Sequence, residues 1–246
     1  MTQTQSKKMP QLRFPKFKRA YQKKNIGSIT QRVVNPVSLK NGVEYTEIGI
    51  KSHGKGIFYK PPTTSLDIGD KRVFWVEADL FIVNIVFAWE QAVAITSKND
   101  VGKIASHRFP MYRASNGKMT TGYLHRFFQT QRGKSLLGIA SPGGAGRNKT
   151  LGQKEFEKLK IYIPDVLEQQ RIADFIFAID KKINLLSQKY EQLIEYKKGV
   201  TKKLLDQKVR FSTDSGQQYP AWQLKRLSEL LDEHKKRNRD LVYGKE

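Results

Sequence analysis

The 246-residue chain contains 45 Lys and Arg against 23 Asp and Glu, which gives a formal net charge of +22 at pH 7. It contains no cysteine, so disulfides and thiolate metal sites are excluded, and a reducing cytoplasm is the expected compartment. No two of its four histidines stand at the i, i+4 spacing of a helical metal site, and its longest apolar stretch is interrupted by acidic and amide side chains, so neither a bound metal nor a membrane span is expected.

The positive charge is unevenly distributed along the chain. Residues 1–164 hold 28 Lys and Arg against 10 Asp and Glu, a net charge of +18, and the rest of the chain adds only +4. Such an excess on a globular segment favours a polyanionic partner, because each neutralised phosphate releases condensed counterions. No basic amphipathic helix accompanies the charge, which favours nucleic acid over a membrane. A basic but inert surface is the other interpretation.

From the N-terminus, residues 1–11 are polar and are expected to form a disordered leader. Residues 12–163 are rich in β-branched and aromatic runs separated by Gly, Pro and Asn turn signals. They predict a compact α+β domain whose core includes Phe74 and Trp75. The predicted strands are 44–50, 56–59, 72–76, 80–87, 92–96 and 109–113, and the predicted short helices are 121–132 and 151–159.

Residues 164–208 predict one long helix that acts as a spacer and dimerisation element. After Pro164 there is no proline up to Gln207, and apolar residues alternate at steps of four and three, the pattern of a coiled-coil seam. A helix of about 42 residues would be about 63 Å long, too long for a core element of this domain; a helix lying along its own domain is the alternative. The seam is Ile172, Ile176, Ile179, Ile183, Leu186, Tyr190, Leu193, Val200 and Leu204, with Lys197 at one polar seam position.

The chain then repeats its own beginning. Residues 12–14 (LRF) reappear as residues 209–211 (VRF), and residues 14–17 (FPKF) resemble residues 219–222 (YPAW). Residues 21–29 align with residues 222–230 in the same way. Residues 209–246 are therefore interpreted as the start of a second, truncated repeat.

These features together resemble the specificity subunit of type I restriction-modification systems. Residues 12–15 (LRFP) followed by 24–29 (KNIGSI) are similar to the family's opening, with Tyr21 where tryptophan is common. Residues 161–180, which contain IYIP and EQQRIADF, are similar to the family's strand-to-helix segment P-x-x-x-E-Q-x-x-I-A. The resemblance spans residues 12–246. Family members usually carry two recognition domains and two antiparallel helices, so this chain resembles a half-length form.

The resemblance implies a division of labour in which this chain binds double-stranded DNA and carries no cofactor. Modification subunits would bind S-adenosylmethionine and methylate adenine N6, and a restriction subunit would use ATP and Mg²⁺ to translocate and cleave. The chain lacks the Asn/Asp-Pro-Pro-Tyr/Phe motif of amino methylation. Because its seam has no second long helix to pair with, an antiparallel homodimer that reads two inverted half-sites is expected.

Two near-matches to catalytic motifs are rejected. Pro164-Asp165 with Glu195-Tyr196-Lys197 spells the PD…ExK pattern of nucleases, but 30 helical residues would separate the two parts by about 45 Å. Residues 143–150 (GGAGRNKT) nearly spell a phosphate-binding loop, with Asn148 where the second glycine belongs. A glycine loop that approaches DNA closely is the favoured interpretation, and a plain connector is the alternative.

The candidate DNA contacts are basic, amide and aromatic residues in predicted turns. Lys and Arg suit phosphates, Arg also binds guanine with two hydrogen bonds, and an aromatic ring can stack or wedge. For each one, a surface charge or a core aromatic is the alternative. The set is Lys51, His53, Lys55, Trp89, His107, Arg108, Arg113, Arg147, Asn148 and Lys149.

Two other functions remain as hypotheses. A truncated subunit could act as a regulatory decoy that sequesters modification subunits without reading DNA productively. An autonomous DNA endonuclease is the third hypothesis, which the rejected motifs argue against. Methylation assays with partner subunits separate the DNA-reading subunit from the decoy. Incubation of the isolated chain with DNA and Mg²⁺ tests the endonuclease hypothesis.

Overall fold

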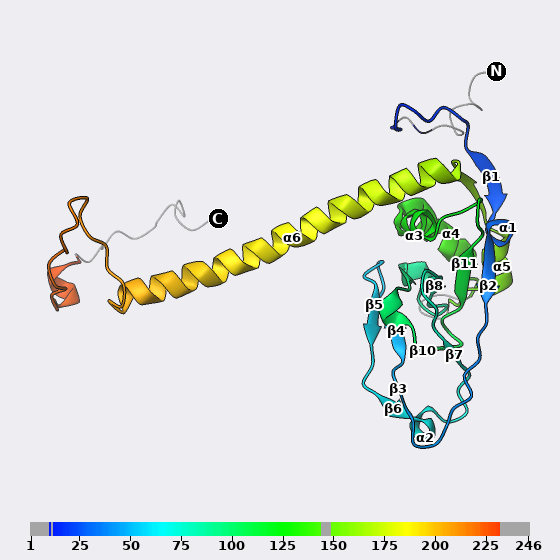
Figure 1. Ribbon diagram of the computed structural model, residues 1–246, viewed down its shortest axis with the longest axis horizontal. Coiled ribbons are helices and arrows are strands. Elements are labelled where there is room, and N and C mark those ends of the chain that lie inside the picture. Colours follow the sequence, from blue (N-terminus) through cyan, green and yellow to red (C-terminus); the bar gives the residue numbers. More distant parts are fainter. Residues whose placement is uncertain (1–9, 11, 144–148, 232–246) are drawn as a thin grey trace, which may run out of the picture. The chain divides into compact units, whose positions relative to one another are not determined.

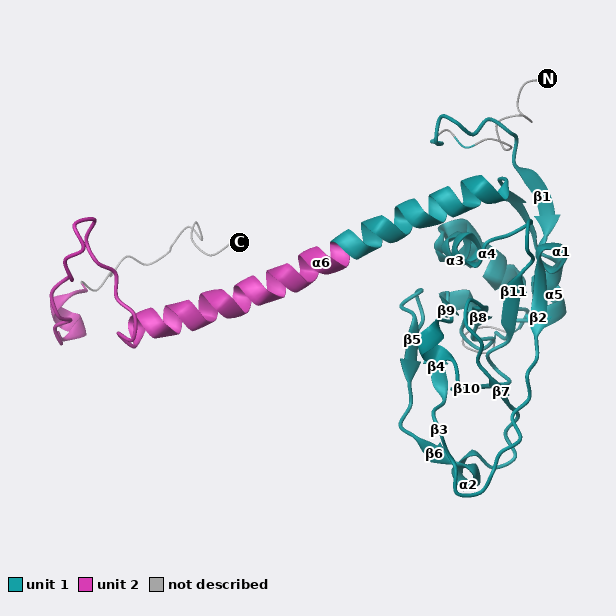
Figure 2. Cartoon of the chain, in the orientation of Figure 1, with its two compact units in different colours: residues 1–182 teal, residues 183–246 magenta. Residues whose placement is uncertain are grey.

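The computed structural model of the chain describes residue 10, residues 12–143 and residues 149–231. The chain divides into two compact units, Met1–Lys182 and Ile183–Glu246, which are coloured separately in Figure 2. The expected leader lies almost entirely outside the described residues, as does the end of the second repeat from residue 232 onward. In the described part of the chain, no helix combines the length and the apolar character that crossing a membrane requires.

The first unit mixes helices and short antiparallel strands, which confirms the α+β class (Figure 1). Its largest sheet has four strands in the order β2 (Thr30–Val33), β11 (Met111–Ala114), β8 (Phe81–Val83), β9 (Val93–Ile95). The other strands form two-stranded sheets: β1 (Gln22–Asn25) with β12 (Lys160–Ile163), β3 (Glu44–Tyr45) with β6 (Thr63–Thr64), β4 (Ile48–Ile50) with β5 (Ile57–Tyr59), and β7 (Val73–Trp75) with β10 (Ile104–Ser106).

Short helices connect and cover these strands. They are α1 (Ile26–Ile29), α2 (Ser65–Ile68), α3 (Thr121–Gln129), α4 (Gln131–Ile139) and α5 (Gln153–Lys158), with 3₁₀ turns at Ala88–Glu90 and Lys98–Asp100. The second unit has a 3₁₀ turn at Leu227–Glu229. Two expectations need correction here. The predicted strand 80–87 ends at Val83, because the Asn84 side chain accepts a hydrogen bond from the Val86 N–H at 3.0 Å and turns the chain. The predicted helix 121–132 is two helices, divided at Thr130, whose hydroxyl accepts from the Gly133 N–H at 3.1 Å.

An aromatic stack forms the centre of the main core. Phe156 of α5 is fully buried and its ring lies parallel to that of Phe81, with 6.1 Å between ring centroids and an interplanar angle of 4°. Tyr112 and Phe128 contact the same ring at centroid distances of 5.1 and 5.4 Å. The stack therefore joins the four-stranded sheet to helices α3 and α5. Phe74 and Trp75 pack against two smaller buried clusters, although both remain partly exposed.

The long helix is confirmed as α6 (Val166–Leu205), a single helix of 40 residues. Asp165 caps it by accepting a hydrogen bond from the Glu168 N–H at 3.0 Å. In the first unit, Ile172 and Ala173 pack against the domain. In the second unit, four seam residues are more than half exposed: Ile183, Leu186, Tyr190 and Leu193. Their pairing in a coiled coil stays a prediction.

Two adjacent buried side chains fix the first turn of α6 to the domain. Glu168 is fully buried and its two carboxylate oxygens accept hydrogen bonds from Nε and Nη2 of Arg13, each at 2.6 Å. The Gln169 side chain, also fully buried, accepts from the Thr120 N–H at 2.9 Å and donates to the carbonyls of Lys118 and Pro164 at 3.0 Å. The start of α6 is thereby connected to both the N-terminal segment and the loop before α3.

The aromatic stack predicts a large loss of stability on truncation of its central ring. Phe156→Ala should lower the free energy of unfolding by about 3–5 kcal/mol, because a fully buried ring is replaced by a cavity. Urea unfolding followed by circular dichroism measures this loss. Phe177→Ala is the matched control: that ring is 65% exposed, and its removal should change the free energy by about 0.5 kcal/mol or less.

Candidate nucleic-acid interface

The turn between β4 and β5 presents three of the expected DNA contacts. Lys51, His53 and Lys55 are exposed, and the Lys51 N–H donates to the Gly56 carbonyl at 2.9 Å to close the turn. His53 and Gly54 both adopt left-handed backbone conformations, with φ of 61° and 64°. Gly54 adopts this conformation without steric cost. His53 tolerates it because backbone hydrogen bonds to a neighbouring turn hold it in place.

The acceptors of those backbone hydrogen bonds are the last residue of the 3₁₀ turn Ala88–Glu90 and the residue that follows it. The His53 N–H donates to the Glu90 carbonyl at 2.7 Å, and the Gly54 N–H donates to the Gln91 carbonyl at 2.9 Å. The Ser52 hydroxyl donates to the Glu90 carboxylate at 2.9 Å. The β4–β5 turn is therefore held against the turn that carries Trp89.

Trp89 and Lys149 are a fourth and a fifth expected residue that lie beside this turn. Trp89 is partly buried, and its indole N–H donates to the Val86 carbonyl at 3.2 Å. The Lys149 ammonium lies 5.9 Å from the centre of its ring, a cation–π distance. The Leu151 N–H donates to the Ile85 carbonyl at 2.8 Å, which brings the chain after Lys149 back to this turn. Arg147 and Asn148, the other expected contacts of the glycine loop, lie outside the described residues.

Two adjoining hollows extend this surface toward His107 and Arg108. Their volumes are about 490 and 500 Å³, and they share four lining residues: Lys60, Asn84, Phe87 and Phe109. The first hollow reaches Ser52 and Glu90, and the second is also lined by Lys71, His107 and Arg108. The Ile85 N–H donates to the Arg108 carbonyl at 2.9 Å, so the two turns are directly connected. Seven of the ten expected contacts thus belong to one surface.

Lys60, Lys71 and the exposed ring of Phe87 belong to this surface but were not expected from the sequence. The Lys60 ammonium pairs with Glu47 at 2.5 Å, and Phe87 is 38% exposed. Lys60 follows β5 directly and Lys71 precedes β7, so their positions at strand ends were the available signal. The Nδ1 atom of His107 is buried without a hydrogen-bond partner in the described part of the chain.

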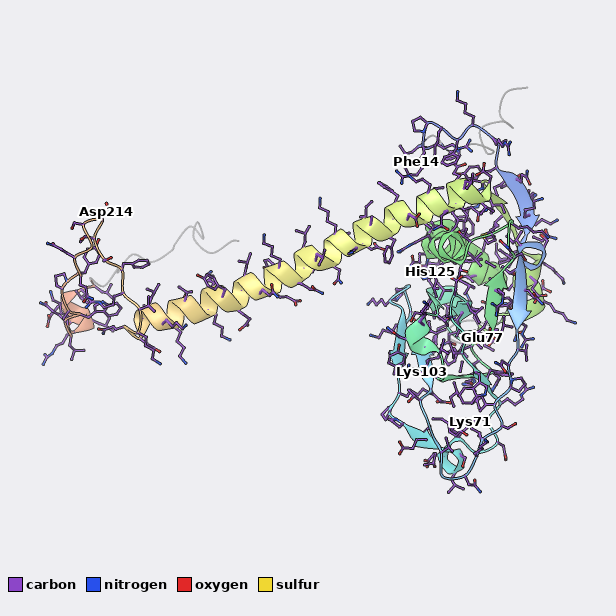
Figure 3. All side chains as sticks on the ribbon, in the orientation of Figure 1. Phe14, Lys71, Glu77, Lys103, His125 and Asp214 are labelled. Atoms are coloured by element: carbon purple, nitrogen blue, oxygen red, sulfur yellow. The ribbon has the colours of Figure 1, made fainter. Side chains whose placement is uncertain are left out.

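Arg113 lies in another part of the first unit. Its guanidinium pairs with Glu77 at 2.5 Å, which offsets the charge that a phosphate contact would use. It lines a separate cavity of about 590 Å³ with His125 and Arg126 of α3 and Asp174 of α6. Figure 3 shows His125 close to the start of α6 and Lys71 near α2, at the opposite end of the unit. Arg113 is therefore not brought together with the other expected residues.

The His125 imidazole, which lines the same cavity as Arg113, is held neutral. Burial lowers its pKa to about 4, and the neighbouring Arg126 guanidinium acts in the same direction. Its Nε2 atom is buried and has no hydrogen-bond partner among the described residues. Arg126 itself pairs with Asp180 of α6 at 2.5 Å, so the cavity lies where α3 and α6 meet.

The lowered pKa of His125 predicts a pH dependence of stability. Below about pH 6.5 the unfolded chain protonates this imidazole while the folded chain does not, so stability is lost as the pH falls from 6.5 toward 4. His125→Gln should reduce this loss by up to about 3 kcal/mol. Chemical unfolding at several pH values measures it, with exposed His53→Gln as the control. Parallel pH curves for His125→Gln and the unchanged chain would contradict the assignment.

The rejected PD…ExK pattern does not form a site in the described residues, and most of the other rejected motif, residues 143–150, lies outside them. Asp165 serves as the cap of α6, and the single helix that follows carries Glu195 and Lys197 as exposed residues. Within residues 12–143 and 149–231 no group of three or more His, Asp or Glu is placed to hold a metal ion. The described surface thus offers basic, amide and aromatic groups on turns.

Comparison with known families places the chain in one of them. Residues 52–195 match the family described as type I restriction modification DNA specificity domain, and the match covers more than half of the chain. The chain belongs to this family. The matched region begins in the β4–β5 turn and includes Trp89, His107, Arg108 and Lys149.

Solved structures similar to this chain include three from type I systems. The crystal structure of the HsdS subunit from Thermoanaerobacter tengcongensis has a TM-score of 0.56 and 14% identity, covering 68% of this chain and 44% of that one. A structure concerning complex assembly and conformational transition of the type I R-M system has a TM-score of 0.46 and 11% identity, covering 79% and 47%. The S subunit from M. genitalium has a TM-score of 0.44 and 13% identity, covering 68% and 41%.

The first of these structures shows that the chain shares the fold of an HsdS subunit. The chain matches less than half of the length of each of the three.

Proposed function

We propose that this chain reads a DNA sequence through the surface formed by the β4–β5 turn, the turn at 84–91 and the turn at 106–109. The observation that carries the proposal is the convergence of seven expected contacts on one hollowed surface, with six of the seven inside the matched region. The +18 charge of residues 1–164 supports it, because phosphate neutralisation supplies much of the affinity of such interfaces.

Within this surface, the exposed cationic groups are suited to phosphates and the hollows to base edges. Lys51, Lys55 and Arg108 are exposed, and long cations in such positions fix the register of a protein on the duplex. Asn84 and His107 line the second hollow and offer an amide and an imidazole, groups that hydrogen-bond to base edges in the grooves. Trp89 supplies an aromatic ring that can contact a base or sugar.

The chain itself is proposed to be non-catalytic and to direct partner subunits to DNA. Those subunits would be the DNA methyltransferase that modifies adenine N6 with S-adenosylmethionine and the restriction subunit that uses ATP and Mg²⁺. A cytoplasmic location fits this role. The buried contacts of Glu168 and Gln169 support it, since they fix the start of α6 within the unit that carries the DNA surface.

The chain is further proposed to act as an antiparallel homodimer through the α6 seam. Apolar seam residues left in water forfeit about 1.5–3 kcal/mol for each that a partner could bury fully. Tyr190 and Leu193 are 66% and 54% exposed, which supports a partner helix there. A two-fold pair would carry two identical recognition domains and read two inverted half-sites with a fixed spacer.

The cation–π pair of Lys149 and Trp89 predicts that Lys149 contributes to DNA affinity. Lys149→Ala should weaken binding several-fold and reduce the slope of log affinity against log salt by about 1, because one phosphate contact is lost. Lys189→Ala on α6 removes the same charge and should leave both quantities unchanged. Fluorescence anisotropy with duplex DNA at several salt concentrations measures both. Equal effects of the two substitutions would exclude Lys149 from the interface.

The homodimer predicts the symmetry of the methylated sequence. Cells that carry this chain with its modification subunit should methylate adenine in two identical inverted half-sites, because the site mirrors the two-fold axis of the reader. Single-molecule sequencing of methylated bases gives this map. An asymmetric bipartite site would contradict the homodimer and require a different second recognition domain. Co-purification with the modification subunit but no methylation would favour the decoy hypothesis.

A further inference from the structure

The two repeated segments share one local structure. In the N-terminal segment (residues 12–29), Nη2 of Arg13 donates to the carbonyl of Arg19 at 2.6 Å, two residues before Tyr21. In the C-terminal segment (residues 209–230), Nη2 of Arg210 donates to the carbonyl of Pro220, two residues before the equivalent Trp222. Each arginine therefore closes the loop that leads to its own aromatic residue.

The N-terminal segment uses the same arginine to bind the start of α6. Arg13 makes a bidentate contact with Glu168, and the two side chains are 8% and 0% exposed. The Phe14 ring packs edge-on against Phe175 at 5.7 Å, and the Arg171 guanidinium lies 5.4 Å from the centre of the Phe14 ring. Glu168, Arg171 and Phe175 together are called the Glu168 socket below. Figure 3 shows Phe14 beside the first turns of α6.

The C-terminal segment carries the same groups in the same order, but its own unit does not bury them. In the described residues, Arg210 contacts backbone carbonyls and pairs with no carboxylate. Phe211, the equivalent of Phe14, is 71% exposed. Leu227 and Leu230 are 72% and 59% exposed, whereas their equivalents in the first copy, Ile26 and Ile29, are 0% and 1% exposed. The segment therefore presents a cation and apolar side chains that its own unit does not cover.

We propose that the C-terminal segment of one chain binds the Glu168 socket of a second copy, in place of that copy's N-terminal segment. Arg210 takes the bidentate position of Arg13, and Phe211 takes the position of Phe14 on Phe175. The occupant is a second copy because the socket's carboxylate and ring match the segment's guanidinium and ring. One socket holds one segment, so binding in trans displaces the resident segment.

The inference rests on the proposed antiparallel homodimer, which brings the C-terminal segment of one copy to the Glu168 socket of the other. The seam from Ile176 to Leu204 is nearly symmetric about Tyr190. A two-fold pair centred on that residue places Val209 of one copy opposite Arg171 of the other. The C-terminal segment then begins beside the partner's socket, and its effective concentration there is high.

A disulfide assay tests the exchange in the full chain, which contains no native cysteine. Chains carrying Arg171→Cys and chains carrying Phe211→Cys are mixed and mildly oxidised, and the mixed dimer is measured on a non-reducing gel. The expected result is a clear excess over a Ser215→Cys control, whose exposed residue lies at the tip of the segment's own turn. Adding Arg210→Ala to the Phe211→Cys chain should lower the yield about tenfold, because the charge-assisted contact is lost.

Two further variants should raise the disulfide yield, whereas Arg210→Ala lowers it. Arg13→Ala in the Arg171→Cys chain should raise the yield several-fold, because the resident segment is weakened while Glu168 and Phe175 of the socket are retained. Phe14→Ala is a milder form of the same change that leaves the buried ion pair in place, and it should raise the yield too. A yield that equals the Ser215→Cys control, or that does not respond to Arg210→Ala, would overturn the exchange.

Sedimentation of the same samples separates this inference from the proposed homodimer. A dimer that forms without the mixed disulfide overturns the exchange and leaves the homodimer standing. A chain that stays monomeric at the concentrations of the assay contradicts both. A dimer with the Arg210-dependent disulfide supports both.

Discussion

Two buried side chains in the first turn of α6 determine how the first unit is connected. Glu168 binds Arg13, and Gln169 binds the backbone at 118–120 and at Pro164. Segments distant in sequence therefore meet at one helical turn. A buried carboxylate is costly to desolvate, and its pair with arginine adds little net stability. Loss of one partner, however, leaves a buried charge alone, at a cost of about 3–5 kcal/mol. The pair therefore favours one arrangement of these segments over its alternatives.

The proposed DNA surface follows a different principle, since backbone groups make most of its connections. The β4–β5 turn binds the turn at 88–91 through the N–H groups of His53 and Gly54, and the turn at 106–109 is bound through the Arg108 carbonyl. Such bonds do not depend on the identity of the exposed side chains. The residues proposed to face DNA can therefore change while the turns that hold them keep their positions.

The sequence predicted those elements that depend on local periodicity. The four-three alternation after Pro164 was sufficient for α6, and turn residues bracketed β4, β5, β7 and β9. The pairing of β1 with β12 joins residues more than 130 positions apart and left no local signal. Helix α4 was not predicted as a separate helix. A side chain in place of Gly133 would meet the Phe127 carbonyl oxygen at 2.3 Å, so that glycine permits the close approach of α4 to the end of α3.

The same limit applies to the candidate site. Their positions in turns predicted Lys51, Lys55 and Arg108 as DNA contacts, and the structure leaves all three exposed. Arg113 had the same local appearance, but Glu77, which arrives from another part of the fold, pairs with it. Lys60 and Lys71 were missed because only the folded chain places them beside His107 and Phe87. Residue type predicts what a side chain can bind, whereas its neighbours decide whether that capacity is already used.

Burial along α6 also divides the seam between two tasks. Ile172 packs against the domain core and Ile176 is partly buried, so the first turns serve the recognition domain. From Ile179 to Leu193 the seam is exposed, and this is the length that a partner helix can cover. In the proposed pair centred on Tyr190, Lys197 faces Ile183 of the other copy, away from the centre, where its ammonium can reach water. A polar seam residue at that place disfavours other registers, and the spacing of the two DNA surfaces then follows from the helix register.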